Sequence, residues 1–102
     1  PTCEQNNAAI YVLPNHAWAR RISGLLANKL AFNANDKSFA VLTQKTDGDY
    51  VVSIRSADPV NKPASNFCSV FPSGGGRQSA AGINRLPVHE LAFFSQRFFS
   101  YF

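Results

Sequence analysis

The chain has 102 residues, of which 45% are hydrophobic and 16% are charged, a balance that excludes a disordered segment and supports one hydrophobic core rather than two. No apolar run reaches the roughly 18 residues of a membrane-spanning helix, and the start of the chain lacks a secretory signal pattern. The net charge of +4 favours anionic partners, without the dense basic stripe of a protein that grips duplex DNA.

A strand and a helix are predicted first. The apolar run from Ala9 to Leu13 stops at Pro14 and is typical of a short buried strand. Apolar residues then recur at helical spacing from Ala17 to about Phe32. The expected packing stripe consists of Trp18, Ile22, Leu25, Leu26 and Leu30, with Arg20, Arg21 and Asn28 turned away. Exposed aromatic rings of this kind stack on nucleobases, but the spacing favours a core role for Trp18 and the phenylalanines.

A β-hairpin and a second helix are predicted next. Two β-rich runs, at residues 38–44 and 50–55, flank the dipeptide Asp47-Gly48, which favours a tight turn between antiparallel strands. Pro63 suits the first turn of a short helix that reaches about Phe71.

The end of the chain predicts a loop at residues 72–82, a brief strand from Ile83 to Leu86, and a last helix opened by Pro87. One stripe of this helix holds Leu91, Phe94, Phe98 and Tyr101, whereas Phe93, Phe99 and Phe102 fall outside it. Two interpretations stay open. Either the core face is broad, or the helix docks on a missing domain or on a second copy of the chain, as a homodimer.

Together these elements predict the fold class α/β (α+β), a small mixed β-sheet with about three helices in the order β-α-β-β-α-β-α. We expect residues 1–102 to form a single domain. Because the chain opens with Pro1 and contains no methionine, we expect it to be a fragment of a longer protein.

The residue types that bind metals are scattered. Cys3 and Cys68 form no Cys-x-x-Cys pair and have no neighbouring histidine pair, so we expect two idle thiols in a reducing, cytoplasmic compartment. His16 and His89 are isolated from one another, and the acidic residues form no Asp-His-His run. The sequence therefore predicts no metal site in this chain.

The segment from Ser73 to Gly82 is the most informative for function. Its glycine run, Gly74 to Gly76, permits backbone conformations closed to other residues, so we expect several N–H groups of a turn to converge on one anion. Arg77 adds a planar fork of donors that matches phosphate, and Arg55-Ser56 ends a predicted strand and supplies a second contact. A plain flexible connection and an exposed strand-end arginine are the alternatives. The spacing matches neither a Walker loop nor a Rossmann fingerprint.

The order of elements, with Ser53-Ile54-Arg55-Ser56 closing the hairpin and Gly74-Gly75-Gly76-Arg77 followed by Ala80-Ala81-Gly82, resembles the DHH-associated (DHHA) domain. That domain forms the C-terminal part of DHH-family phosphoesterases, which include proteins similar to the RecJ exonuclease, nanoRNA-degrading oligoribonucleases and cyclic-dinucleotide phosphodiesterases. In this family an N-terminal DHH domain binds manganese, and the associated domain grips the substrate across a cleft.

The resemblance implies that the partner is a missing N-terminal DHH domain carrying Mn²⁺, and that this chain alone holds no cofactor and no catalytic residue. It also implies a short oligonucleotide or small nucleotide phosphate as ligand. The implied binding residues are Arg55, Ser56, Gly74, Gly75, Gly76, Arg77, Ala81 and Gly82.

The sequence departs from the family pattern of four glycines and a histidine, because Ser73 takes the first glycine position and Arg77 the histidine position. Arginine keeps the charge but exchanges no proton near neutral pH. Two other interpretations stay open. One is a nucleic-acid-binding module without hydrolytic activity, as in the C-terminal domains of alanyl-tRNA synthetases. The other is an acetyl-CoA-binding, acetyltransferase-like domain, from a faint match of residues 77–82 to its pyrophosphate loop.

Overall fold

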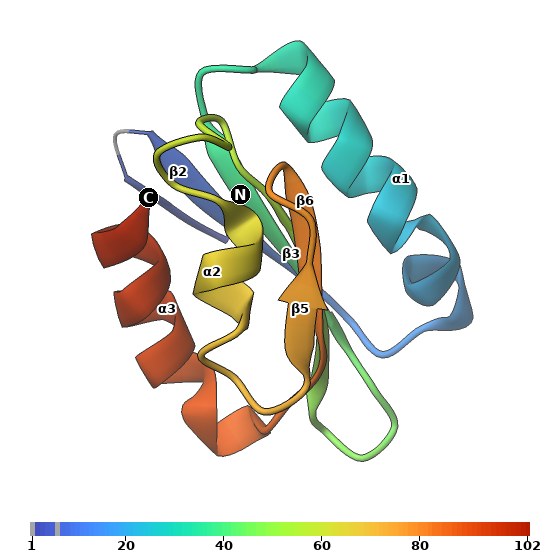
Figure 1. The fold of residues 1–102 in the computed structure, drawn as a ribbon. Coiled ribbons are helices and arrows are strands. Elements are labelled where there is room, and N and C mark those ends of the chain that lie inside the picture. Colours follow the sequence, from blue (N-terminus) through green and yellow to red (C-terminus); the bar gives the residue numbers. More distant parts are fainter. Residues whose placement is uncertain (1, 6) are drawn as a thin grey trace.

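The structure, a computed structural model, describes residues 2–5 and 7–102, and it is built on one mixed β-sheet. The strands are β1 (Cys3–Gln5), β2 (Ala8–Leu13), β3 (Ser38–Gln44), β4 (Tyr50–Arg55), β5 (Gly74–Gly76) and β6 (Ala80–Leu86). The helices are α1 (Ala17–Asn33), α2 (Ala64–Cys68), the short 3₁₀ turn η1 (Val88–Glu90) and α3 (Leu91–Tyr101). Helix α1 covers one face of the sheet, and α2 and α3 cover the other (Figure 1). The predicted α+β class is confirmed.

The sheet has the strand order β1-β2-β3-β4-β6-β5. Strands β2 and β3 are parallel and joined by α1, and every other neighbouring pair is antiparallel. The β3–β4 hairpin closes where Asp47-Gly48 predicted it, since Gly48 has a φ of 91° and the Asp49 amide donates to Asp47 Oδ1 at 2.9 Å.

Two strands were not predicted, and both lie at the edges of the sheet. Strand β1 is exposed along its whole length and joins β2 antiparallel, with Glu4 paired to Lys37. Strand β5 is the glycine run itself. Neither segment has the alternating apolar pattern of a strand, because β1 is mostly polar and β5 has no side chains.

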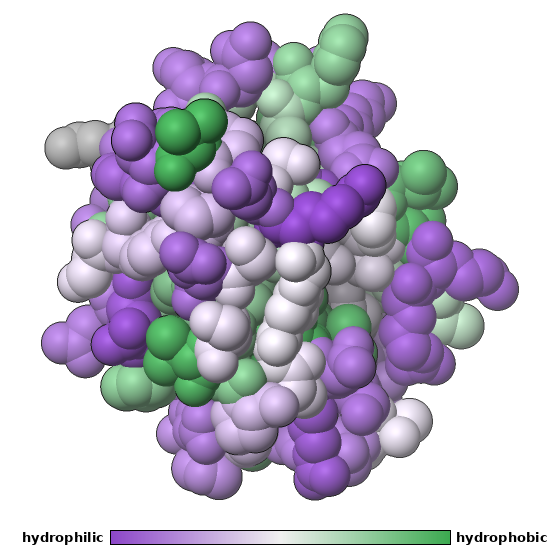
Figure 2. Space-filling view, viewed as in Figure 1, coloured by the Kyte–Doolittle hydropathy of each residue, from purple (hydrophilic) through white to green (hydrophobic). Residues whose placement is uncertain are grey.

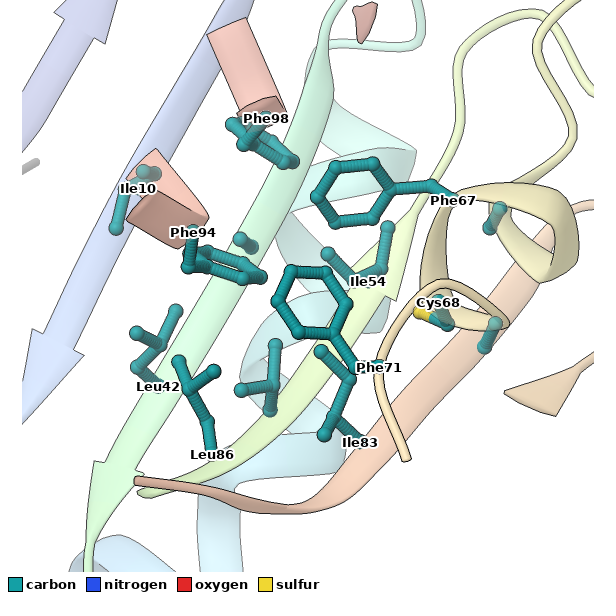
Figure 3. Close-up of a cluster of buried hydrophobic side chains, with 14 of the residues drawn as sticks. Ile10, Leu42, Ile54, Phe67, Cys68, Phe71, Ile83, Leu86, Phe94 and Phe98 are labelled. Carbon is teal, nitrogen blue, oxygen red and sulfur yellow. The ribbon is translucent and has the colours of Figure 1, made fainter. Parts of the chain in front are cut away.

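The main core lies between the sheet and the helices α2 and α3, and it is rich in aromatic rings (Figure 3). Phe67 of α2 contacts five other rings, with centroid distances of 5.5–5.9 Å to Phe71, Phe94, Phe98, Tyr101 and Phe102. Phe94, Phe98 and Phe102 are buried and Phe99 is partly buried, whereas Phe93 is exposed. The broad core face therefore accounts for most of the aromatic residues of α3.

Helix α1 packs through a different face from the one predicted. Its fully buried residues are Ala19 and Ala27, while the exposed fractions of Trp18, Ile22 and Leu25 are 48%, 38% and 71%. The space beneath the helix is already filled by the buried side chains of β3, which on this face are Phe39, Val41 and Thr43. The helix therefore approaches the sheet through small residues and turns much of its apolar stripe outward.

Asp49 links the β3–β4 turn to the segment that leads into α3. Its carboxylate accepts hydrogen bonds from the Val88 amide at 2.9 Å and from Arg85 Nε at 2.7 Å. The Val88 amide first, and then Arg85, lower the pKa of Asp49 below its ordinary value of 3.8. A carboxylate with a lowered folded pKa stabilises the fold above its unfolded pKa, and this stabilisation is lost as the pH falls through the folded pKa.

We therefore expect Asp49→Asn to flatten the acid side of the stability profile. The free energy of unfolding of the unmodified chain, measured by urea denaturation, should fall between pH 6 and pH 3 by more than that of the variant. Asp36→Asn, at an exposed carboxylate, is the matched control and should keep the full decline. Equal slopes for the unmodified chain and Asp49→Asn would contradict this role.

Candidate anion-binding site

Two of the predicted site residues, Arg55 and Arg77, lie on the same face of the sheet. Arg55 of β4 pairs with Ala80 of β6, and the Arg77 amide donates to the Ala80 carbonyl at 2.8 Å. Arg77, directly after the end of β5, therefore continues the row of Arg55 and Ala80, with the two arginine Cα atoms roughly 10 Å apart, and residues in one row point to the same side. That side is the α1 face, because Arg55 Nε donates to Asn28 Oδ1 of α1 at 2.8 Å.

The positive charge of this pair is not neutralised within the described part of the chain. Among residues 2–5 and 7–102, the close contacts between basic and acidic side chains join Lys37 to Glu4, Arg85 to Asp49 and His89 to Glu90, and none involves Arg55 or Arg77. Burial lowers the pKa of Arg55, and the nearby charge of Arg77 lowers it further. Two guanidinium groups held together without a carboxylate form a site that an anion stabilises.

Beside the arginines, the α1 face of the sheet has a floor almost without side chains. The next row across β4, β6 and β5 consists of Ser53, Gly82 and Gly75. No atom lies within 4 Å of the place where a Gly75 side chain would begin. Figure 2 shows a pale, near-neutral surface over β5, with strongly hydrophilic side chains toward the turn end of the β5–β6 hairpin. Within this row Gly75 is exposed, whereas Ser53 and Gly82 are half-buried.

The predicted loop at residues 72–82, with glycine amides that converge on an anion, is wrong. Gly74 to Gly76 form strand β5, which pairs antiparallel with β6. The Gly74 amide donates to the Phe71 carbonyl at 3.0 Å. The alternation of an antiparallel ladder directs the Gly75 amide toward Gly82 and leaves only the Gly76 amide pointing outward at the edge. The arginine side chains, rather than backbone amides, are therefore the groups that this site could offer to an anion.

Three of the predicted glycines are restricted by packing. A side chain at Gly82 would begin 2.6 Å from the Val52 carbonyl oxygen, and Gly74 and Gly76 are crowded in the same way. A side chain at Gly74 would begin 1.8 Å from the Cys68 carbonyl oxygen of α2. Gly76 has a φ of 141°, and a side chain there would begin 2.5 Å from Ala81 Cα. Ala81 is itself buried in the core beneath α2 and α3. Gly74, Gly76 and Ala81 therefore lie on the opposite face of the sheet from the arginines.

Ser56 is close to the site in sequence, but its hydroxyl is occupied. Its Oγ donates to the Lys62 carbonyl at 2.6 Å and accepts from the Asp58 amide at 3.1 Å. The Ser56 amide donates to the Ser79 carbonyl at 3.0 Å, which ties the end of β4 to the turn of the β5–β6 hairpin. The role of Ser56 in the structure is to fix the loop behind Arg55.

Two residues of the site were missed from the sequence. Asn28, expected to point away from the core, orients the Arg55 side chain through their hydrogen bond. Ser53 lies on the glycine floor, in register with Gly82. Ser53 could have been predicted, because side chains alternate along a strand and Ser53 is two residues before Arg55. The contact with Asn28 could not, because it depends on how α1 crosses the sheet.

The rest of the described structure has surface pockets but neither a metal-binding group nor a membrane-spanning helix. Two surface pockets, of about 430 and 300 Å³, lie along α3, and Gln96 and Ser100 line both. Within residues 2–5 and 7–102, no three His, Cys, Asp or Glu side chains gather into a group that could hold a metal ion. None of the helices in the described ranges has both the length and the apolar character needed to cross a membrane.

No protein-family model and no curated protein matches this sequence significantly.

Proposed function

We propose that this chain is the substrate-binding domain of a manganese-dependent DHH-family phosphoesterase and holds a phosphate of a short oligonucleotide or small nucleotide. The observation that carries the proposal is the pair Arg55 and Arg77, which lie on one face of the sheet beside an open glycine floor and have no carboxylate partner among the described residues. Guanidinium groups suit phosphate because their planar donors match its oxygens in pairs.

In this proposal Arg55, Arg77 and the N-terminal DHH domain have different roles. Arg55, held by Asn28, supplies a half-buried donor, and Arg77, on the hairpin turn, supplies an exposed one. The N-terminal DHH domain expected in the longer protein would hold Mn²⁺ and would supply the metal-assisted hydrolysis. Because arginine stays protonated near neutral pH, Arg77 binds and neutralises the phosphate without donating a proton to the leaving group.

The alternatives predict different outcomes. A nucleic-acid-binding module without hydrolytic activity uses the same arginines, so only the activity of the complete protein separates it from the proposal. An acetyltransferase-like loop places its ligand at the start of a helix. Strand β6 begins at Ala80 instead, which disfavours that interpretation.

We expect Arg77→Ala to weaken the binding of adenosine 3′,5′-bisphosphate by about 1–3 kcal/mol, or roughly 5- to 150-fold, because one charge-assisted contact is lost. NMR titration of the chain gives the dissociation constants. Arg97→Ala removes the same charge from an exposed position on α3, on the other side of the sheet, and should leave affinity unchanged. Equal affinities of Arg77→Ala and the unmodified chain would remove the proposal.

Hydrolysis by the complete protein then tests the reaction class. In the presence of Mn²⁺, dinucleotides, short RNA, short DNA and 3′-phosphoadenosine nucleotides are compared as substrates. Turnover of one of them, with KM raised by Arg77→Ala, supports the phosphoesterase. Binding without turnover supports the nucleic-acid-binding module.

A further inference from the structure

The outer face of α1 carries large apolar side chains that the fold does not use. Besides Trp18, Ile22 and Leu25, the ring of Phe32 is 86% exposed, the highest value among the large hydrophobic residues of the described chain. These residues recur at helical spacing on one side of the helix. An aromatic ring left almost wholly in water gives the fold little stability, and a run of exposed apolar side chains on one helix face is typical of a contact surface.

Phe32 lies beside the anion-binding site and not at a distance from it. It follows Asn28 by four residues on α1, which places the two Cβ atoms about 6 Å apart on neighbouring turns. A helical side chain leans toward the N-terminal turn, so the Phe32 ring leans toward Asn28. Asn28 in turn accepts the hydrogen bond from Arg55 Nε at 2.8 Å. The ring therefore borders the phosphate site on its α1 side.

The charged residues near Phe32 indicate which kind of ligand group would contact its exposed ring. Lys29 precedes Phe32 by three residues on α1, and Arg55 lies against Asn28 one turn away. Arg20 and Arg21 belong to the far end of the helix, and the nearest acidic residue in sequence is Asp36, which lies beyond the end of α1. Exposed aromatic rings among cations match the alternating flat bases and negative phosphates of a nucleotide. An acidic or purely apolar partner surface would match only one of these two features.

We propose that Phe32 is the base-stacking residue of the site and packs against the nucleobase of a nucleotide whose phosphate is bound by Arg55 and Arg77. This inference rests on the proposed function and adds a specificity determinant to it. The phosphate contacts bind any phosphorylated ligand, and the ring of Phe32 selects ligands that carry a planar base.

The test compares adenosine 5′-phosphate with ribose 5-phosphate, which has the same phosphate and no base. By NMR titration, the unmodified chain should bind the nucleotide about tenfold more tightly than the sugar phosphate, a difference typical of one base stacked on an aromatic ring. Phe32→Ala should abolish this difference by weakening nucleotide binding alone. Phe32→Trp, which restores a stacking surface, should keep it.

Trp18 provides a matched control on the same helix. It is also an exposed aromatic residue, but it precedes Phe32 by 14 positions, a rise of about 21 Å that one nucleotide does not span. Trp18→Ala should therefore leave both affinities unchanged.

The remaining outcomes separate the two proposals. If Arg77→Ala weakens both ligands while Phe32→Ala leaves the preference for adenosine 5′-phosphate intact, the stacking role is wrong and the phosphate site stands. If the unmodified chain binds neither ligand, the phosphate site fails, and the stacking role fails with it.

Discussion

Phe67→Ala is expected to lower the free energy of unfolding by about 3–5 kcal/mol, the range found when a fully buried phenylalanine is truncated in a packed core. Phe67 is 1% exposed and contacts five other rings drawn from α3 and from the residues that follow α2 and α3. Figure 3 shows its ring in the space between α2, α3 and the sheet. Removing it leaves a cavity between these three elements.

Thermal denaturation followed by circular dichroism measures the effect. A loss of this size corresponds to a fall in melting temperature of roughly 15–30 °C for a domain of about this length. Phe32→Ala makes the same chemical change at a residue that is 86% exposed, and its unfolding free energy should stay within about 0.5 kcal/mol of the unmodified chain. Similar losses for the two variants would show that Phe67 is not the centre of the core.

Gly74→Ala is expected to cost about 3 kcal/mol, at the upper end of the usual cost of overpacking. The added methyl group would begin 1.8 Å from the Cys68 carbonyl oxygen, a backbone atom that also accepts the Phe71 amide at 3.0 Å. No side-chain rotation relieves that clash. Strand β5 and the end of α2 must separate, and the hairpin that carries Arg77 moves with them.

Gly75→Ala is the control for this prediction, one residue further along the same strand. Its side chain would begin with no atom within 4 Å. The unfolding free energy should change by no more than about 1 kcal/mol, since the variant gains the entropic advantage of alanine over glycine in the unfolded chain. Urea denaturation of both variants measures the contrast. A tolerated Gly74→Ala would mean that β5 and α2 are not in close contact.

The sequence predicted those elements whose local pattern agrees with their tertiary environment. The β3–β4 hairpin has alternating or continuous apolar runs and the Asp47-Gly48 turn, and the structure confirms both strands and the turn. The Gly74 to Gly76 run has no side-chain pattern at all. This strand forms because the Arg77–Ala80 hydrogen bond closes a tight hairpin and because β6 pairs with it. Neither contact can be read from the local sequence of the glycine run.

The outward face of α1 shows a second limit. Apolar periodicity finds a stripe, but it cannot say that alanines elsewhere on the helix fit a sheet already filled by Phe39 and Val41. The candidate site was half predictable for a related reason. Arg55 and Arg77 were identified by residue type and position. Their placement on neighbouring parts of one sheet depends on the strand order β4-β6-β5, which no local sequence pattern encodes.

The two cysteines differ in burial, so their reactivity toward an alkylating reagent reports local opening of the structure. Cys68 is buried in α2 and burial raises its pKa to about 12, whereas Cys3 is exposed on β1. Electrophiles react with the thiolate, so the native molecule offers them one sulfur atom and the opened molecule offers two. The rate at which the second sulfur is alkylated thus counts the excursions in which α2 detaches from the sheet, with no engineered label.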